Sequence, residues 1–442
     1  MSLPLYNRYQ DSGTDWLKEV PEHWNLRRLG YYFAERREKV SDKEFAALSV
    51  TKNGIVSQLE TAAKTDDGDN RKKVVAGDFV INSRSDRKGS AGIASQDGSV
   101  SLINTVLTPV AGVDRCFVHH LLRSVAFQEE YYRYGKGIVA DLWSTNYSEM
   151  KAITLAMPPH PEQSAIAAFL DRETTKIDVL MEEQKRLIEL LKEKRQAFIS
   201  HAVTKGLNPD AKMKPSGVEW LGEVPDHWEV LMLKRCFSSV DYGISDSLEP
   251  DGVVAVLRMG NIQDGKVEVD DLKYIDQVDE GLLLRTDDLL YNRTNSLDLI
   301  GKVGRFIERD GPTTFASYLV RLRTSDNCDP TFMAYLLNTE GVLGSARSRA
   351  FVAIGQCNLN PTRYGEIVVA IPPPSEQRSI ANVLDARIAE IGPLATEAQK
   401  TIGLLQERRA ALISAAVTGK IDVRNFAVVG TGVAKELAYA DL

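Results

Sequence analysis

The chain has 442 residues, of which 43% are hydrophobic, and its mean hydropathy is −0.22, as is typical of a globular protein with two or three domains. No apolar run is long enough to span a bilayer, and the first residues lack the hydrophobic region of a signal peptide, so we expect a cytoplasmic protein without a membrane partner. The four cysteines are scattered and form no Cys-x-x-Cys pair, which argues against a disulfide framework or a zinc site.

The net charge is −7, and it is unevenly distributed along the chain. Residues 1–155 hold 21 basic and 20 acidic residues, whereas residues 207–371 hold 17 basic and 25 acidic residues. A protein that binds nucleic acid by itself is usually basic. Any DNA binding by this chain therefore has to rely on local basic patches, or on a partner that supplies positive surface.

The first element along the chain is a tryptophan motif that occurs twice. The stretch Ser12-Gly-Thr-Asp-Trp-Leu-Lys-Glu-Val-Pro-Glu-His-Trp24 returns as Ser216-Gly-Val-Glu-Trp-Leu-Gly-Glu-Val-Pro-Asp-His-Trp228. We interpret the motif as structural, because two large aromatic rings and a proline can fix the start of a block against its core. Stacking of the tryptophans on a ligand is the alternative. We expect His23 and His227 to satisfy hydrogen bonds rather than to take part in chemistry.

The blocks that follow each motif share an order of elements. A strand, a polar turn and a second strand come first, followed by a strand that ends in an Asn/Arg/Ser loop, a Gly-containing hairpin, a helix and a polar loop. In the first block these are Phe45–Ser57, Ala76–Ser85, Gly89–Ala94, Val118–Tyr132 and Tyr134–Tyr147; in the second they are Val254–Val267, Thr286–Asn295, Gly301–Phe306, Pro330–Leu343 and Ser348–Pro361. Many short strands and few helices predict an α+β, sheet-rich fold for each block.

The polar turns of both blocks carry residue types that recognise nucleic acid. Arg can bind guanine with two hydrogen bonds and Asn can do so with adenine, while Lys suits phosphates. The candidate contacts are Lys52, Asn53, Asn82, Arg84, Arg87, Lys88, Arg133 and Lys136 in the first block, and Arg258, Asn261, Asn292, Arg293, Asn295, Arg347 and Arg349 in the second. For any single one, an ordinary solvated surface residue is the competing interpretation. Different residues in matching loops are what two readers of different half-sites would show.

Each block leads into a long helical stretch, and the two stretches are copies of each other. Residues 161–206 and 375–420 align without a gap at an offset of 214. A heptad repeat of apolar residues predicts a coiled coil, and two equal helices in one chain would pair most simply with each other. The expected pairing residues are Leu170, Ile177, Leu191 and Phe198 with Leu384, Ile391, Leu405 and Leu412, joined by Leu180, Leu187, Ile188, Leu394 and Ile402. Gly392-Pro393 should kink or restart the second helix. Two core helices of one large domain are the alternative.

The chain lacks the sequence motifs of an enzyme. Met157–His160 and Ile371–Pro374 do not match the Asn-Pro-Pro-aromatic tetrapeptide of a DNA methyltransferase, and Gly430-Thr-Gly432 has too few residues after it for a nucleotide-binding βαβ unit. Asp86-Arg-Lys88 has a nuclease-like triplet but no plausible upstream carboxylate on a Pro-Asp strand, and the six histidines do not cluster as metal ligands. We therefore expect neither catalytic nor metal-binding residues in this chain.

Together these features resemble the specificity subunit of type I restriction-modification enzymes. The resemblance lies in the two tryptophan motifs, in the Pro-Pro-x-x-Glu-Gln-x-x-Ile-Ala-x-x-Leu-Asp helix starts at Pro158–Asp171 and Pro372–Asp385, and in the Ala-Val-Thr helix ends. It covers the chain up to about residue 421. It implies target-recognition domains at 1–157 and 207–371, conserved spacer helices at 158–206 and 372–420, and a C-terminal tail at 421–442.

The resemblance also implies a function. Each recognition domain would read one half of a bipartite, asymmetric double-stranded DNA site. The two conserved helices would pair as an antiparallel coiled coil, set the gap between the half-sites and dock two methyltransferase subunits. The methyltransferase would carry S-adenosylmethionine, so no cofactor is expected in this chain, and two motor-nuclease subunits would complete a restriction complex. A coiled-coil scaffold that does not read DNA remains the alternative, and a self-sufficient restriction enzyme is disfavoured by the missing motifs.

Overall fold

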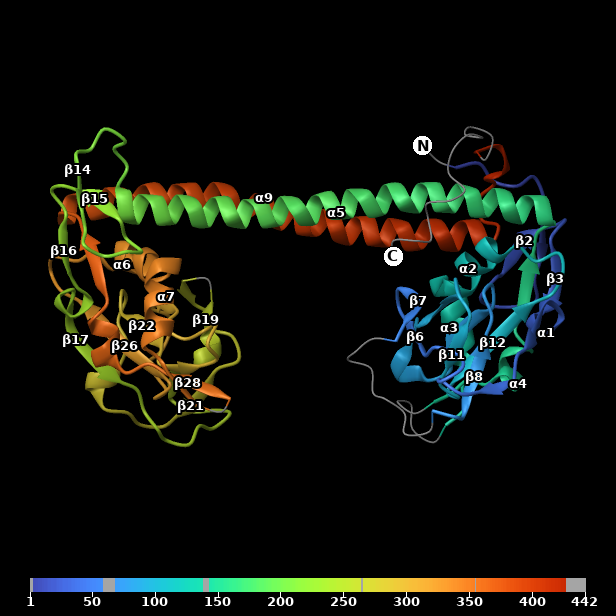
Figure 1. The fold of residues 1–442 in the computed structure, drawn as a ribbon, viewed down its shortest axis with the longest axis horizontal. Helices are drawn as coiled ribbons and strands as arrows, with labels where there is room; N and C mark the ends of the chain where they lie inside the picture. The colour runs from blue at the N-terminus through green and yellow to red at the C-terminus, as the bar shows by residue number, and fades with distance from the viewer. Residues whose placement is uncertain (1–2, 59–67, 138–142, 264, 354, 427–442) are drawn as a thin grey trace. The chain divides into compact units, whose positions relative to one another are not determined.

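The computed structural model describes residues 3–58, 68–137, 143–263, 265–353 and 355–426. The chain forms two compact units, which comprise Met1–Gln184 with Lys400–Leu442 (unit 1) and Lys185–Gln399 (unit 2) (Figure 1). Each unit therefore contains one sheet-rich block and part of each long helix. Within the described residues, every helix is too short or too polar to cross a membrane.

The long helices are α5 (His160–Lys205) and α9 (Pro374–Val417), and they pack against each other in both units. In unit 1, Leu170 near the start of α5 shares a core with Val417 at the end of α9. In unit 2, Val203 near the end of α5 shares a core with Leu384 near the start of α9. The start of one helix thus meets the end of the other, which confirms the predicted antiparallel pair.

The seam between the helices differs in part from the predicted one. Leu170, Ile177, Leu384 and Ile402 are buried as expected, and Ile188, Leu191, Phe198, Ile391, Leu405 and Leu412 are half-buried. The prediction was wrong for Leu180, Leu187 and Leu394, whose side chains are 45%, 41% and 56% exposed. The second row of the seam runs instead through Thr174, Met181 and Ile188. Leu180 lies three residues after Ile177 and Met181 lies four residues after it, so both neighbouring positions on the helix surface carry an apolar side chain. The sequence does not distinguish them, and packing places Met181 in the seam.

The sequence predicted a kink or a restart at Gly392-Pro393, and the restart is wrong, because α9 continues through Pro393 as one helix. Proline has no N–H to donate to the carbonyl four residues earlier, which belongs to Ala389. Both Ala389 and Pro393 are exposed, so water can satisfy that carbonyl. The Thr396 hydroxyl donates to the Gly392 carbonyl at 3.2 Å, which adds a local hydrogen bond at the same turn.

The block of unit 1 consists of short antiparallel sheets with two helices beside them. The sheet orders are β10-β9-β12-β4, β11-β8-β5, β6-β7, β13-β3 and β1-β2. The strands are β1 (Tyr9–Asp11), β2 (Glu19–Pro21), β3 (Asn25–Arg28), β4 (Phe33–Glu35), β5 (Lys39–Val40), β6 (Leu48–Thr51), β7 (Gly54–Ser57), β8 (Arg71–Val74), β9 (Phe79–Asn82), β10 (Ala91–Ile93), β11 (Gly98–Val100), β12 (Asn104–Pro109) and β13 (Thr154–Met157). The shorter helices are α1 (Leu29–Tyr32), η1 (Ser85–Arg87), α2 (Arg115–Arg123), α3 (Val125–Arg133), α4 (Tyr147–Met150) and η6 (Arg424–Phe426).

The block of unit 2 has a similar plan around larger sheets, and two of its described strand pairs are parallel. Their orders are β17-β26-β22-β24-β20-β19, β21-β18-β25, β23-β28-β27, β16-β29 and β14-β15. The strands are β14 (Met213–Pro215), β15 (Glu223–Pro225), β16 (Glu229–Met232), β17 (Phe237–Tyr242), β18 (Val254–Leu257), β19 (Ile262–Gln263), β20 (Lys266–Val267), β21 (Lys273–Ile275), β22 (Leu289–Asn292), β23 (Thr294–Asn295), β24 (Val303–Arg305), β25 (Thr313–Phe315), β26 (Leu319–Thr324), β27 (Phe351–Ala353), β28 (Gln356–Asn358) and β29 (Val368–Ile371). The helices are η3 (Leu233–Arg235), η4 (Met259–Asn261), η5 (Glu280–Leu282), α6 (Pro330–Leu337), α7 (Glu340–Arg349) and α8 (Pro361–Gly365).

Each single helix predicted after the strands is a pair of helices in the structure. In unit 1 the break falls at Ser124, whose extended backbone ends α2 and whose hydroxyl accepts a hydrogen bond from the Phe127 N–H to cap α3. In unit 2, Asn338 and Thr339 separate α6 from α7. Ser, Asn and Thr stabilise such breaks because their side chains bond to free backbone groups at helix ends.

The tryptophan motif attaches each block to the start of a long helix. In unit 1 the Glu162 carboxylate accepts hydrogen bonds from the Tyr6 hydroxyl at 2.7 Å and the Trp24 Nε1–H at 3.0 Å, and it lies 2.7 Å from Nε2 of His23. In unit 2 Glu376 makes the equivalent contacts with Trp228 Nε1 at 3.2 Å and His227 Nε2 at 2.7 Å. Trp24 and Trp228 are buried, so the structural interpretation of the motif is confirmed.

The glutamine after each of these glutamates holds the first short helix of the block. The Gln163 side-chain carbonyl accepts from the Asp114 backbone N–H at 2.8 Å, and Asp114 is the N-cap of α2. Gln377 accepts in the same way from Asp329, the N-cap of α6, at 2.7 Å. The Glu-Gln pair common to both helix starts therefore fixes two parts of the block relative to the helix.

The two ends of the described chain meet in unit 1. The Asp422 N–H donates to the Pro4 carbonyl at 2.8 Å, and the Lys420 ammonium donates to the Leu17 and Glu19 carbonyls. Of the predicted tail 421–442, residues 421–426 belong to this contact and the remainder lies outside the described residues.

Candidate nucleic-acid interface

In unit 1 the structure joins two polar loops that lie far apart in the sequence. The loop between β9 and β10 carries Arg84, Arg87 and Lys88, and it meets the segment after α3 through paired backbone of Arg84 and Ser144. Lys136 also pairs with Ser144, so Lys136 lies at the same junction. Five residues of the second loop, 138–142, lie outside the described residues.

The predicted basic residues of this loop cluster are exposed, and several have acidic partners. Lys88 forms an ion pair with Glu129 and lies 5.5 Å from the centre of the Tyr132 ring. Arg133 pairs with Glu130 at 3.0 Å, and Lys136 with Glu149 at 3.3 Å. Exposed ion pairs contribute little to stability and can exchange for contacts with phosphate. Arg84 and Arg87 are also exposed, and Arg87 lies 3.6 Å from Asp86.

Lys52 and Asn53 lie at the exposed tip of the β6–β7 hairpin, which is tied to α2. The Arg123 guanidinium donates to the Lys52 carbonyl at 2.6 Å and to Nε2 of His119 at 2.7 Å. Burial, together with the charge of Arg123, lowers the pKa of the His119 imidazole to about 3. His119 is therefore neutral at physiological pH and can accept the hydrogen bond from Arg123.

In unit 2 an equivalent cluster forms around β23. Thr294 and Asn295 of β23 pair with Asn358 and Cys357 of β28, which brings the loop after β22 next to the β27–β28 hairpin. Arg293 donates to the Ser317 carbonyl at 3.2 Å and lies 5.1 Å from the centre of the Tyr242 ring. The Arg349 guanidinium bonds to the Ser345 carbonyl within α7.

Three predicted asparagines are buried rather than exposed. Asn82, Asn261 and Asn292 are 7%, 5% and 1% exposed. The Asn82 side-chain carbonyl accepts from the Arg84 N–H at 3.1 Å, and the Asn261 amide bonds to Arg258 and Asp270. In this structure Asn82 and Asn261 hold their loops in shape, because buried amide groups need such partners, and Asn292 is enclosed in β22. The candidates at the surface are the cations, together with Asn53 and Asn295.

The strands that lead into the two loop clusters are fixed by similar ion pairs. Asp78 before β9 binds Arg36 through both carboxylate oxygens at 2.7 and 3.1 Å, and Asp288 before β22 binds Arg323 at 2.7 and 3.2 Å. The hydrogen bond to the nearly buried carboxylate raises the pKa of Arg36 and of Arg323. Bidentate pairs of this kind fix orientation as well as position, so the loops start from rigid strands.

Sequence reasoning missed an exposed aromatic residue in each loop cluster. Trp143 is 38% exposed, and its carbonyl accepts from the Ser85 N–H at 2.9 Å. Phe351 of β27 is 68% exposed, beside the strand that pairs with Asn295. Aromatic rings at a nucleic-acid surface can contact bases and sugars. A large aromatic residue inside a predicted loop was the signal that could have identified both.

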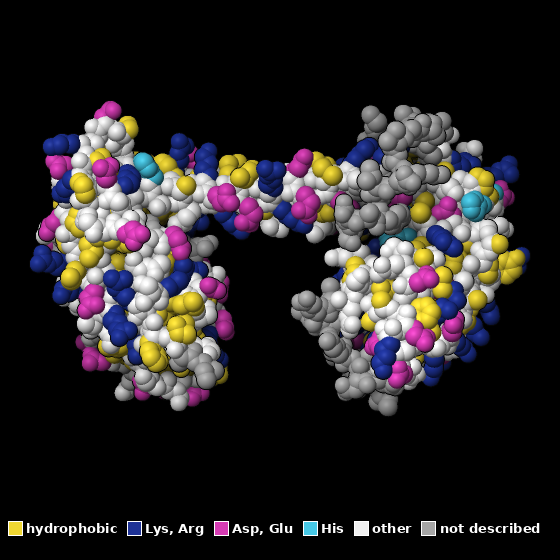
Figure 2. All heavy atoms as spheres, viewed as in Figure 1, with side chains coloured by type: hydrophobic (Ala, Val, Ile, Leu, Met, Phe, Trp, Pro, Cys, Tyr) yellow, Lys and Arg dark blue, Asp and Glu magenta, His cyan; other side chains and the backbone are white. Residues whose placement is uncertain are grey.

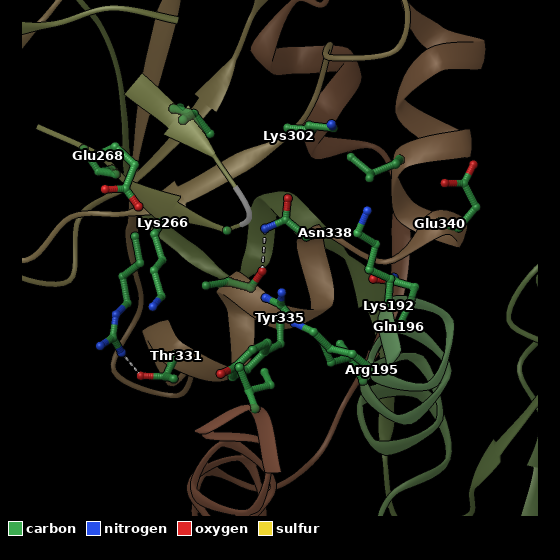
Figure 3. A pocket seen from close by; sticks show the side chains of 18 of the residues that line it. Lys192, Arg195, Gln196, Lys266, Glu268, Lys302, Thr331, Tyr335, Asn338 and Glu340 are labelled. Carbon is green, nitrogen blue, oxygen red and sulfur yellow. Dashed lines mark hydrogen bonds between the residues drawn. The ribbon is translucent and has the colours of Figure 1, made fainter. Parts of the chain in front are cut away.

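A second feature missed from the sequence is a cleft of about 980 Å³ in unit 2, lined by α5, α6, α7 and the β19–β20 hairpin (Figure 3). Among its described lining residues are six cations, of which only Arg347 was predicted as a DNA contact. The six are Lys192, Arg195, Lys266, Lys302, Arg305 and Arg347. Elsewhere, on the face seen in Figure 2, basic and acidic side chains are interspersed.

The described residues contain no group of three or more His, Cys, Asp or Glu side chains that could hold a metal ion. His23 and His227 bond to the carboxylates of Glu162 and Glu376, as predicted. His120 bonds to Asp171 at 2.7 Å. These histidines therefore have structural partners.

Comparisons with known proteins identify the relatives of this chain. No protein-family model matches it. The MjaX specificity subunit of a type I restriction enzyme from Methanocaldococcus jannaschii is 26% identical over 170 residues, which are 37% of this chain and 40% of that protein. The EcoKI specificity subunit of Escherichia coli (strain K12) is 20% identical over 324 residues, which are 72% of this chain and 68% of that protein. The match thus spans less than half of the first relative and about two thirds of the second.

Solved structures share the fold. One comes from work on complex assembly and conformational transition of the type I R-M system, with a TM-score of 0.64 and 14% identity over 90% of this chain and 98% of that chain. The HsdS subunit from Thermoanaerobacter tengcongensis has a TM-score of 0.52 and 15% identity over 91% of this chain and 98% of that chain. This chain is therefore a relative of the type I restriction enzyme specificity subunits and shares their fold.

Proposed function

We propose that this chain is the DNA sequence-specificity subunit of a type I restriction-modification complex, and that each block reads one half of a bipartite, asymmetric site. The observation that carries the proposal is the duplicated loop cluster. Both units present basic and aromatic side chains on loops that start from rigid strands, and both blocks are attached to a long helix through the same Glu-Gln pair. The strands and the helix attachments of the two blocks are alike, whereas the exposed loop residues differ. Two domains that recognise different DNA sequences require this combination.

The loop residues divide into two kinds of contact. Arg84 and Arg293 extend from loops directly after the central strands β9 and β22, where a guanidinium can make two hydrogen bonds to guanine in the major groove. Lys88 and Lys136 are suited to phosphates, because a flexible ammonium gives charge without base selectivity. Trp143 and Phe351 add apolar contact to bases or sugars.

The helices and the partners complete the proposal. We infer that the lengths of α5 and α9 set the gap between the half-sites, and that two methyltransferase subunits dock on them and supply S-adenosylmethionine. This chain is then the non-catalytic subunit of a cytoplasmic complex, which two motor-nuclease subunits can join. The partners' positive surface would compensate for the net charge of −7.

The alternative is a coiled-coil scaffold that does not read DNA. It accounts for the helix pair and the acidic charge. It does not account for two sets of differing cations and aromatics on equivalent loops, nor for the likeness to specificity subunits over most of the chain.

A base-resolution map of methylated adenines in host DNA, with and without this gene, tests the proposal. Deletion should remove methylation from one split motif. Exchanging residues 1–157 for those of a relative should then change one half of that motif and leave the other half unchanged. A map that is the same in both strains, although the methyltransferase is expressed, would refute the proposed function.

A further inference from the structure

The cleft of unit 2 carries a concentration of positive charge in the more acidic half of the protein. Residues 207–371 hold 17 basic and 25 acidic residues, yet the described lining of the cleft takes four cations and three carboxylates from this range. The long helices add Lys192, Arg195 and Asp385, so the lining has six cations against four carboxylates. The cations come from α5, from β20, from β24 and the segment leading into it, and from α7 (Figure 3). They therefore converge from opposite walls.

Two of the four carboxylates are engaged by neighbouring side chains. Asp385 accepts a hydrogen bond of 2.5 Å from the Tyr335 hydroxyl, and burial together with this bond raises the pKa of Tyr335. Glu340 forms an ion pair of 2.5 Å with Arg347. In contrast, Lys266 and Lys302 have no ion-pair partner among the described residues, and the buried Nε of Arg195 has no hydrogen-bond partner there. A buried donor without a partner costs free energy that a ligand can recover.

The duplication shows why Arg195 has no carboxylate partner among the described residues. At the offset of 214, Arg195 of α5 corresponds to Arg409 of α9, and a smaller cleft of about 250 Å³ in unit 1 is lined by Arg409 and Arg123. Arg409 forms an ion pair with Asp178 at 2.8 Å. The position that corresponds to Asp178 in the second copy is Gly392. The arginine is thus present in both copies, but its helix-borne acidic partner exists in unit 1 alone.

We propose that the unit 2 cleft binds the sugar–phosphate backbone of DNA through Arg195, Lys266 and Lys302, an inference that rests on the proposed function. The ligand has to be a polyanion, because separate cations on opposite walls suit a row of charges better than one ion. Successive phosphates of one strand lie about 3.4 Å apart along the duplex axis, so a strand across the cleft mouth presents several charges to these side chains. The contact is independent of sequence and offsets the acidic charge of this block, whereas the loop cluster around β23 reads bases.

The salt dependence of DNA binding tests this assignment. The sample is the full-length chain in complex with its host methyltransferase, and the readout is fluorescence anisotropy with a duplex carrying the methylated motif and with an unrelated duplex. Each phosphate contact contributes about 0.9 to the slope of log K against log salt. The double variant Lys266→Gln/Lys302→Gln should therefore lower the slope by about 2 and weaken binding to both duplexes by the same factor. The methylated motif should not change.

Matched variants separate the cleft from general effects. Lys234→Gln/Arg235→Gln removes the same charge from the exposed η3 segment, outside the cleft lining, and should leave the slope near the wild-type value. Lys266→Arg/Lys302→Arg keeps the charge and should also keep the slope. Arg195→Gln alone should lower the slope by about 1.

Three results would overturn the assignment. One is an unchanged slope in the cleft variants, and another is an equal change in the η3 control. The third is weaker binding of the methyltransferase with an unchanged slope, which would make the ligand an acidic protein segment. If the wild-type complex binds neither duplex and methylates no motif, the proposed function itself fails, and this outcome is distinct from the other three.

Discussion

The attachment of each block to its long helix gives a prediction with a control built into the chain. Replacing Glu162 with Ala removes a carboxylate that is 7% exposed and leaves the buried Tyr6 hydroxyl and Trp24 Nε1–H without partners. Each buried donor left unpaired costs about 1–3 kcal/mol, so the expected loss of unfolding free energy is roughly 4 kcal/mol. The same change at Glu376, which is 29% exposed, leaves one buried donor, Trp228 Nε1–H, and should cost about 1–2 kcal/mol.

Scanning calorimetry of the full-length variants measures the difference. For units of this size, 1 kcal/mol corresponds to about 2–4 °C in Tm, so the Glu162 variant should lower the transition of unit 1 by roughly 8–16 °C. The Glu376 variant should lower that of unit 2 by only a few degrees. Both glutamates lie in the first turn of a long helix, so the loss of a favourable helix-dipole interaction is common to the two variants and cancels in the comparison.

Equal shifts in the two variants would refute the reasoning, because they would mean that helix-end electrostatics, and not the buried donors, determine the effect. A shift below 2 °C for Glu162→Ala would show that the Tyr6 and Trp24 donors find other partners, such as water. Glu162→Gln, which keeps one acceptor oxygen, should fall between Ala and the wild type.

Three further predictions follow from particular contacts. The pKa of His119 is lowered to about 3 in the folded chain, so between pH 6.5 and 3 the unfolded state binds a proton more readily than the folded state. The free energy of unfolding therefore falls as the pH falls through this range. In urea denaturation, the wild type should lose about 2–3 kcal/mol of unfolding free energy between pH 7 and 4.5 relative to His119→Gln. Leu170→Ala should cost about 2–4 kcal/mol because Leu170 is fully buried, whereas Leu180→Ala should cost less than about 1 kcal/mol; similar losses in chemical denaturation would contradict the observed seam. Deleting seven residues from α5 alone should shift the gap of the methylated motif or abolish recognition, and an unchanged gap in the methylation map would argue against a spacer role for the helices.

The sequence by itself determined the duplicated plan of this protein. The repeat at an offset of 214, the heptad rows through Leu170 and Leu384, and the two tryptophan motifs are periodic or repeated signals. Such signals can be detected in the sequence because each copy of a buried helix face, or of an anchoring contact, requires the same residue type. They predicted the paired helices, and they supplied the residues of the resemblance, which implied that the helices run antiparallel.

Tertiary structure decided which polar residues are available to a ligand. The sequence shows that Asn82 and Arg84 are neighbours in a polar loop, but only packing shows that the amide of Asn82 is turned inward to hold the loop while Arg84 remains exposed. In the same way, α9 continues through Pro393 because that turn of the helix faces solvent. The presence of a proline in the sequence does not indicate whether its turn is exposed.

The cleft in unit 2 depended on tertiary structure most of all. Arg195, Lys266 and Lys302 lie far apart in the sequence and belong to no shared motif, and the block that contains Lys266 and Lys302 is acidic. A sequence shows the net charge of residues that are neighbours along the chain. A ligand instead interacts with the charged side chains that are neighbours in space. Only the packing of α5 beside the β19–β20 hairpin and α7 brings these cations to one surface.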